Sequence, residues 1–167
     1  ASDVYKRQTL WREVAINHYC DAPVLARYIV NKCFIENHPV SNLQLQKILF
    51  FLQTIFCKSK NGLELLFLDE FEAWPYGPVP PNVYQEFSEY GGIPIERKFI
   101  TDLRFDEETS NFIDEGINIL SEKSPWDLVR LSHAKGSPWA RVFKNGEGYK
   151  QTIPNKFIVE SITPQTR

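Results

Sequence analysis

The chain has 167 residues, which is enough for one domain with a sizeable core, and 43% of these residues are hydrophobic. Its formal net charge of −2 provides no overall basic field to attract nucleic-acid phosphates. Its apolar runs, such as residues 48–52, are far shorter than the roughly 20 residues that span a bilayer. We therefore expect a cytoplasmic, single-domain protein. The elements predicted below make it a compact fold of mainly α (α+β) class.

The two ends of the chain and the cysteines give further expectations. Methionine is absent, and the first eight residues show no periodicity. We expect residues 1–10 to be a non-native or disordered extension and one domain to cover residues 11–163. Cys20, Cys33 and Cys57 include no CxxC pair, so we expect reduced core thiols rather than a disulfide framework.

Two amphipathic helices are predicted in the first part of the chain. Asp21 is a suitable N-cap, and the apolar spacing predicts a helix over residues 22–36, which ends before Pro39. Ser41 and Gln44 form a capping-box pattern for a second helix over residues 42–58. The second helix is apolar over a wide arc, which predicts a central position in the fold.

The middle of the chain contains the sequence AWPYGPV at residues 73–79. Alternation around Phe71 and Ala73 predicts a short strand that runs into this turn, and Pro80 and Pro81 begin a helix that stops at Gly91. Residues 93–105 have an extended character. We expect them to pair with the earlier strand in a small antiparallel element.

Four helices are predicted in the last part of the chain, three of them from N-cap residues. Asp106 caps a helix that reaches Leu120, Ser124 caps a helix over residues 126–134, and Ser137 caps a short helix that ends at Phe143. A last short helix is expected over residues 153–162.

The sequence contains no recognisable set of catalytic residues. No His, Cys, Asp or Glu cluster has metal-ligand spacing, and no phosphate-binding glycine motif is present. Ser132 and His133 are adjacent on a predicted helix, where neighbours point about 100° apart and cannot readily bond to each other. We predict no catalytic residue, metal or cofactor, and we retain an enzyme with His133 as base as an alternative.

Aromatic and basic residues suggest binding. Trp74, Tyr76, Trp126 and Trp139 are candidate core residues or protein-interface anchors. A nucleic-acid-binding regulator is a further alternative, and it would need a local basic patch, for which the candidates are Lys32, Arg97, Lys98 and Arg104.

Four blocks of the sequence form a recognisable pattern. They are VLARYIV at 24–30, SNLQLQKILF at 41–50, AWPYGPV at 73–79 with Tyr84, and Leu131, Ser132 and His133 with Pro138 and Trp139. In this order they resemble the Panacea domain family of SocA-like antitoxins and phage-associated GepA-type proteins. The chain departs from the family pattern at Phe50, where a hydroxyl is lost, and at Pro75, which replaces a basic residue.

The resemblance implies an antitoxin that neutralises a cognate toxin by direct protein contact, without catalysis or cofactor. The alternatives it allows are an adaptor that delivers the toxin to a protease and a phage-associated nucleic-acid-binding regulator. The expected partner-binding residues are Trp74, Tyr76, Pro78, Tyr84 and Lys47.

Some of these positions have a structural interpretation as well. Trp74 is favoured as a filler between the central helix and the following helix, and Lys47 is either solvated or partner-binding. Gln46 is expected to bond the backbone of the AWPYGPV turn. The expected structural motif consists of Leu45, Gln46, Gly77, His133 and Trp139.

Overall fold

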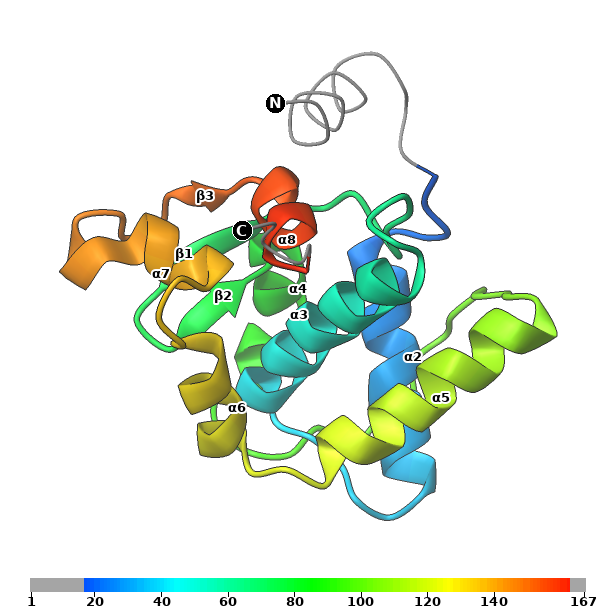
Figure 1. Cartoon of the computed structure of the whole chain (residues 1–167). Coiled ribbons are helices and arrows are strands. Elements are labelled where there is room, and N and C mark those ends of the chain that lie inside the picture. The colour runs from blue at the N-terminus through cyan, green and yellow to red at the C-terminus, as the bar shows by residue number, and fades with distance from the viewer. Residues whose placement is uncertain (1–16, 163–167) are drawn as a thin grey trace.

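The structure is a computed structural model, and residues 17–162 are described (Figure 1). The expected extension at residues 1–10 and the ends of the expected domain lie outside this range. The elements are α2 (Ala22–Ile35), α3 (Asn42–Ser59), β1 (Phe71–Trp74), β2 (Gly77–Val79), α4 (Pro81–Glu86), η1 (Ser88–Tyr90), α5 (Glu107–Ser121), α6 (Pro125–Ser132), α7 (Pro138–Phe143), η2 (Lys144–Gly146), β3 (Thr152–Ile153) and α8 (Asn155–Ser161).

The mainly α (α+β) class is confirmed, and α3 is the central element. It packs against α2, α5, α6 and α8 and against β2 (Figure 1). Its two phenylalanines widen the apolar arc, with Phe50 buried and Phe51 partly buried. A helix contacted on so many sides needs this wide arc, because each neighbour buries a different stripe of its surface.

The predicted caps occur at the predicted places. The side chains of Ser41, Asp106, Ser124 and Ser137 each accept a hydrogen bond from the backbone N–H three residues later. Asp21 precedes α2 but makes no side-chain cap bond. The N–H of Ala22 donates instead to Asp69 Oδ1 at 2.9 Å, so a distant carboxylate satisfies the first turn of α2.

The sheet has three antiparallel strands in the order β2-β1-β3. The expectation that residues 93–105 pair with β1 is wrong, because the second partner of β1 is β3, with Ile153 opposite Phe71. Residues 93–105 lie against α2 instead. The side chain of Asn31 on α2 donates to the Phe99 carbonyl and accepts from the Phe99 N–H, which satisfies backbone groups without a strand partner.

Candidate protein-binding site

The AWPYGPV segment forms a hairpin, in which Trp74 pairs with Gly77 across the turn. Gly77 has φ +105°, a conformation that favours glycine. A Cβ atom added there would lie 2.5 Å from Ser132 Oγ and 2.9 Å from Lys47 Cε. The inner side of the hairpin is therefore in close contact with α3 and α6 and leaves no room for a side chain.

Lys47 on α3 binds the inner side of the hairpin. Its side chain is fully buried, and Nζ donates to the Pro78 carbonyl oxygen at 2.9 Å. Burial lowers the pKa of Lys47 to about 7. Lys47 and Pro78 both lie inside the fold. The expectation that Lys47 is solvated is therefore wrong, and so is the expectation that these two residues offer surface to a partner.

Gln46 does not have the expected role. Its Nε2 donates to Asn42 Oδ1, and its buried Oε1 has no hydrogen-bond partner among residues 17–162. The bond to the hairpin backbone that we expected from Gln46 is made by its neighbour Lys47. Neighbouring helix positions point about 100° apart, so only one of the two side chains can face the hairpin.

His133 and Trp139 hold the hairpin from the other side. Trp139 Nε1 donates to the Trp74 carbonyl at 2.7 Å, and the His133 ring is stacked on Trp139 with ring centroids 3.8 Å apart. Burial and, to a lesser extent, the charge of Lys47 lower the pKa of His133. Leu45, Gly77 and Trp139 are buried as well. Trp139, with His133 stacked on it, therefore supports the hairpin from within the fold.

The structure gives no support to an enzyme with His133 as base. Ser132 Oγ donates to the Val129 carbonyl at 2.7 Å, and the His133 ring faces Trp139. The two side chains therefore form no nucleophile–base pair. Across residues 17–162, no group of three or more His, Cys, Asp or Glu side chains is placed to hold a metal ion.

The outer side of the hairpin presents aromatic rings. Tyr76 is 56% exposed and Trp126 is 51% exposed, and their rings meet edge to face with centroids 5.3 Å apart. Trp74 is partly buried against Tyr84, with centroids 4.8 Å apart, and Lys150 Nζ lies 5.0 Å from the Trp74 ring centroid. This face carries Trp74, Tyr76 and Tyr84, three of the five residues expected to bind a partner.

Sequence reasoning did not place Trp126 at this site. About 50 positions separate Tyr76 from Trp126, and no local pattern links them. Their contact depends on how α6 packs against β2 and α3. The sequence does contain one signal for the position of Trp126. The proline that follows Ser124 fixes the start of α6 and therefore places Trp126 on the first turn of this helix.

Residues 45–140 match the family described as Antitoxin SocA-like, Panacea domain. The chain belongs to this family. Antitoxin SocA of Caulobacter vibrioides (strain NA1000 / CB15N) is 33% identical over 144 residues, which cover 77% of this chain and 72% of that relative. No solved structure matches the chain.

Membership in the SocA-like Panacea family supports a role as an antitoxin and implies a toxin as the general class of partner. The matched region contains the hairpin and the residues that support it from α3, α6 and α7. Within residues 17–162, no helix is long and apolar enough to cross a membrane.

Proposed function

We propose that this protein is a cytoplasmic antitoxin that neutralises a cognate toxin by direct binding, with the Tyr76–Trp126 pair at the centre of the contact. The observation that carries the proposal is that two large aromatic side chains touch each other while each remains more than half exposed. Tyr and Trp are the side chains that most often dominate binding energy in protein interfaces.

The rigidity of the hairpin supports this choice of surface. Tyr76 lies in a turn that is held from inside by the Lys47–Pro78 and Trp139–Trp74 hydrogen bonds. A side chain on a preset turn loses little conformational entropy on binding, so more of the contact energy appears as affinity. Catalysis and a cofactor play no part in this function.

The test is coexpression with the protein encoded beside this chain, followed by measurement of the dissociation constant of the purified pair. We expect Tyr76→Ala and Trp126→Ala each to weaken binding by about tenfold or more and to reduce rescue of growth. Ile100→Ala is the control, since Ile100 is 97% exposed on the 93–105 segment, and we expect it to bind like wild type.

Two outcomes test the antitoxin role and the assigned binding surface separately. If the neighbouring protein is harmless alone, or stays lethal in the presence of this chain, the antitoxin role is wrong. If Tyr76→Ala and Trp126→Ala both bind like wild type, the antitoxin role stands and the assigned surface is wrong.

The family resemblance favours a second candidate, an adaptor that delivers the toxin to a protease. The lifetime of the toxin distinguishes this mechanism from occlusion, in which the bound antitoxin simply covers the toxin. An adaptor shortens the half-life of the toxin in cells that contain the protease, whereas occlusion leaves it unchanged or longer. A pulse-chase measurement of the toxin with and without this chain distinguishes the two mechanisms.

A further inference from the structure

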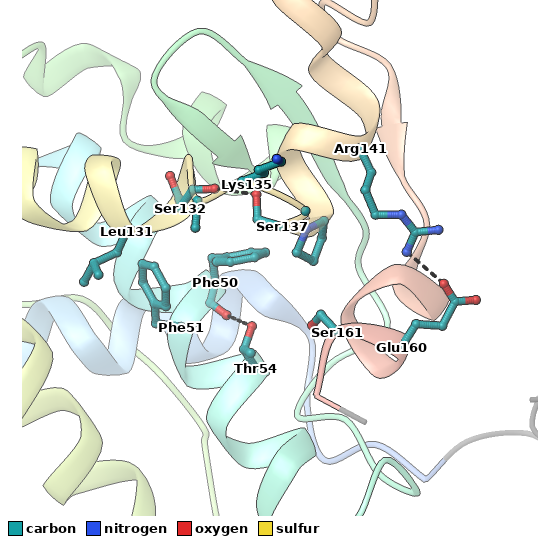
Figure 2. A pocket seen from close by; sticks show the side chains of 13 residues that line it. Phe50, Phe51, Thr54, Leu131, Ser132, Lys135, Ser137, Arg141, Glu160 and Ser161 are labelled. Atoms are coloured by element: carbon teal, nitrogen blue, oxygen red, sulfur yellow. Dashed lines mark hydrogen bonds and ion pairs between the residues drawn. The ribbon is translucent and has the colours of Figure 1, made fainter. Parts of the chain in front are cut away.

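A cleft of about 700 Å³ lies between α3, the α6–α7 connection and α8. Figure 2 shows the rings of Phe50 and Phe51 between these elements, with Leu131 at one edge and the Arg141–Glu160 ion pair at the other. Leu131 is 52% exposed, so the apolar floor continues to the protein surface. This volume falls in the range of protein clefts that enclose a small molecule, so the cleft has room for a large side chain of a partner.

The segment that lines most of the cleft is basic although the whole chain is slightly negative. In residues 123–162, the acidic Asp127 and Glu160 are paired with Arg130 and Arg141. Five lysines of this segment are exposed, and no ion pair joins them to another described residue. The basic residues of the segment are Lys123, Arg130, Lys135, Arg141, Lys144, Lys150 and Lys156, and the acidic ones are Asp127, Glu147 and Glu160.

The opposite distribution holds for residues 17–122, where Asp and Glu predominate. Figure 1 shows α6 and α7 at the left of the view and α8 near its centre, while most of α5 extends to the right. The net charge of −2 therefore conceals a basic segment, residues 123–162, which supplies most of the residues that line the cleft. The basic patch expected at Lys32, Arg97, Lys98 and Arg104 lies elsewhere, and Lys32 and Arg104 are paired there with Glu36 and Asp102.

We infer that this cleft receives an apolar side chain of the toxin that is flanked by acidic residues. This inference rests on the proposed antitoxin function. Phe50, Phe51 and Leu131 provide the apolar floor, and Lys135 at the rim provides the charge that an acidic neighbour would meet.

The position of the cleft suits a partner that also covers the Tyr76–Trp126 pair. Trp126 and Leu131 both lie on α6, and five helical residues span about 7.5 Å along the axis. A stable interface covers about 800 Å² on each partner, far more than two aromatic side chains can supply. The two side chains point about 140° apart around the helix axis, so a partner that covers both must curve around α6.

A protein segment fits this site better than a nucleic acid does. A phosphate backbone needs a track of cations, but among the residues that line the cleft only Lys135 is an unpaired cation, since Arg141 is paired with Glu160 at 2.8 Å. The floor of the cleft is made of phenylalanine and leucine side chains, which favour an apolar group. The many acidic residues in the rest of the chain would also repel a long polyanion.

The test measures the dissociation constant of the purified protein and the toxin encoded beside it. Thr54→Trp fills the cleft from α3, and Lys135→Glu reverses the charge at its rim. The matched controls are Asn118→Trp on the exposed side of α5 and Lys98→Glu on the 93–105 segment. Thermal unfolding followed by circular dichroism verifies that every variant is folded.

We expect both cleft variants to weaken binding by about tenfold or more and both controls to stay within about twofold of wild type. Binding by wild type should weaken as salt rises from 50 to 500 mM, and Lys135→Glu should show a shallower dependence. Lys135 is exposed, so Lys135→Glu tests the inference even if Thr54→Trp fails to fold.

Three results would overturn the inference in distinguishable ways. If wild type does not bind the toxin, the proposed function and the inference both fail. If the toxin binds and both cleft variants behave like the controls, only the cleft is wrongly assigned. If a 20-base-pair DNA duplex competes with the toxin and loses binding in both cleft variants, the cleft is a nucleic-acid site.

Discussion

Lys47 is the most unusual residue of the fold, because its ammonium group is fully buried beside a neutral carbonyl. A buried charge is costly unless it is paired, and no ion pair of Lys47 occurs in the described part of the chain. Lowering the pKa to about 7 reduces this cost, because the amine is then neutral in part of the molecules near neutral pH. A neutral amine still donates to the Pro78 carbonyl.

Lys47→Met should make stability less dependent on pH. Burial lowers the pKa of Lys47 from 10.5 to about 7, so the unfolded chain binds more protons than the folded one between these values. The stability of wild type should therefore gain up to about 1.4 kcal/mol per pH unit in that window, relative to the variant. The measurement is urea unfolding of both proteins at pH 7 and pH 9.5.

The comparison with Lys47→Met is needed because other groups also titrate at high pH. Burial raises the pKa of Tyr28 and Cys20 to about 12, which lowers stability as the pH rises, equally in both proteins. Parallel stability curves for wild type and Lys47→Met would show that the buried amine does not titrate in this window.

At the scale of elements, the hairpin depends on one glycine in contact with two buried side chains. Lys47 is 0% exposed and Ser132 is 1% exposed, so neither side chain has free space into which to move. A shift of Lys47 would also break its bond to Pro78. The AWPYGPV turn therefore tolerates no added atom on its inner side.

Gly77→Ala should destabilise the protein by about 1–3 kcal/mol more than Gly146→Ala does. Both glycines have a positive φ, +105° for Gly77 and +102° for Gly146, so both variants carry comparable backbone strain. A Cβ at Gly146 meets nothing within 4 Å, which isolates the steric overlap at Gly77. Equal losses in denaturant unfolding would contradict the close contact.

The elements differ in how well the sequence predicts them. The caps at Ser41, Asp106, Ser124 and Ser137 are predictable because a cap is made by residues three positions apart. The pairing of β1 with β3 is not predictable in this way. Residues 93–105 have an extended character, but this does not reveal which segment pairs with the edge of β1. The two-residue β3 is too short for alternation to reveal it.

The candidate site shows the same limit. The prolines of AWPYGPV predict a rigid turn, which follows from local chemistry. The exposure of Tyr76 does not follow from the motif, because it depends on what packs against the turn. The choice between Gln46 and Lys47 as the residue under the hairpin depends on the rotation of α3 about its axis. Only the packing of α3 among its neighbours sets that rotation, so the sequence pattern leaves it open.

At the scale of the whole molecule, the early and late parts of the chain share one core. A single cluster of buried residues extends from Ala22 on α2 to Ile158 on α8. Ile153 of β3 belongs to this cluster and lies opposite Phe71 of β1. Unfolding of the C-terminal segment should therefore remove support from the hairpin and from α3 together.

Ile153→Ala should lower the free energy of unfolding by about 2–4 kcal/mol, because it opens a cavity in the shared core. Ile119→Ala, at a position 55% exposed on α5, should change it by less than about 0.5 kcal/mol. We expect circular dichroism and tryptophan fluorescence to report one coincident transition in urea. Two separate transitions would show that the C-terminal segment unfolds independently.

The position of β3 at the edge of the sheet also has a consequence for synthesis. Glu72 pairs with Thr152, about 80 positions later in the chain. A ribosome that adds roughly 5–20 residues per second needs about 4–16 s to cover that interval. Throughout this time one edge of β1 is unpaired, and for the first part of it the Trp74 carbonyl also lacks its donor Trp139. Chains that end before residue 152 therefore contain a central strand without its second partner.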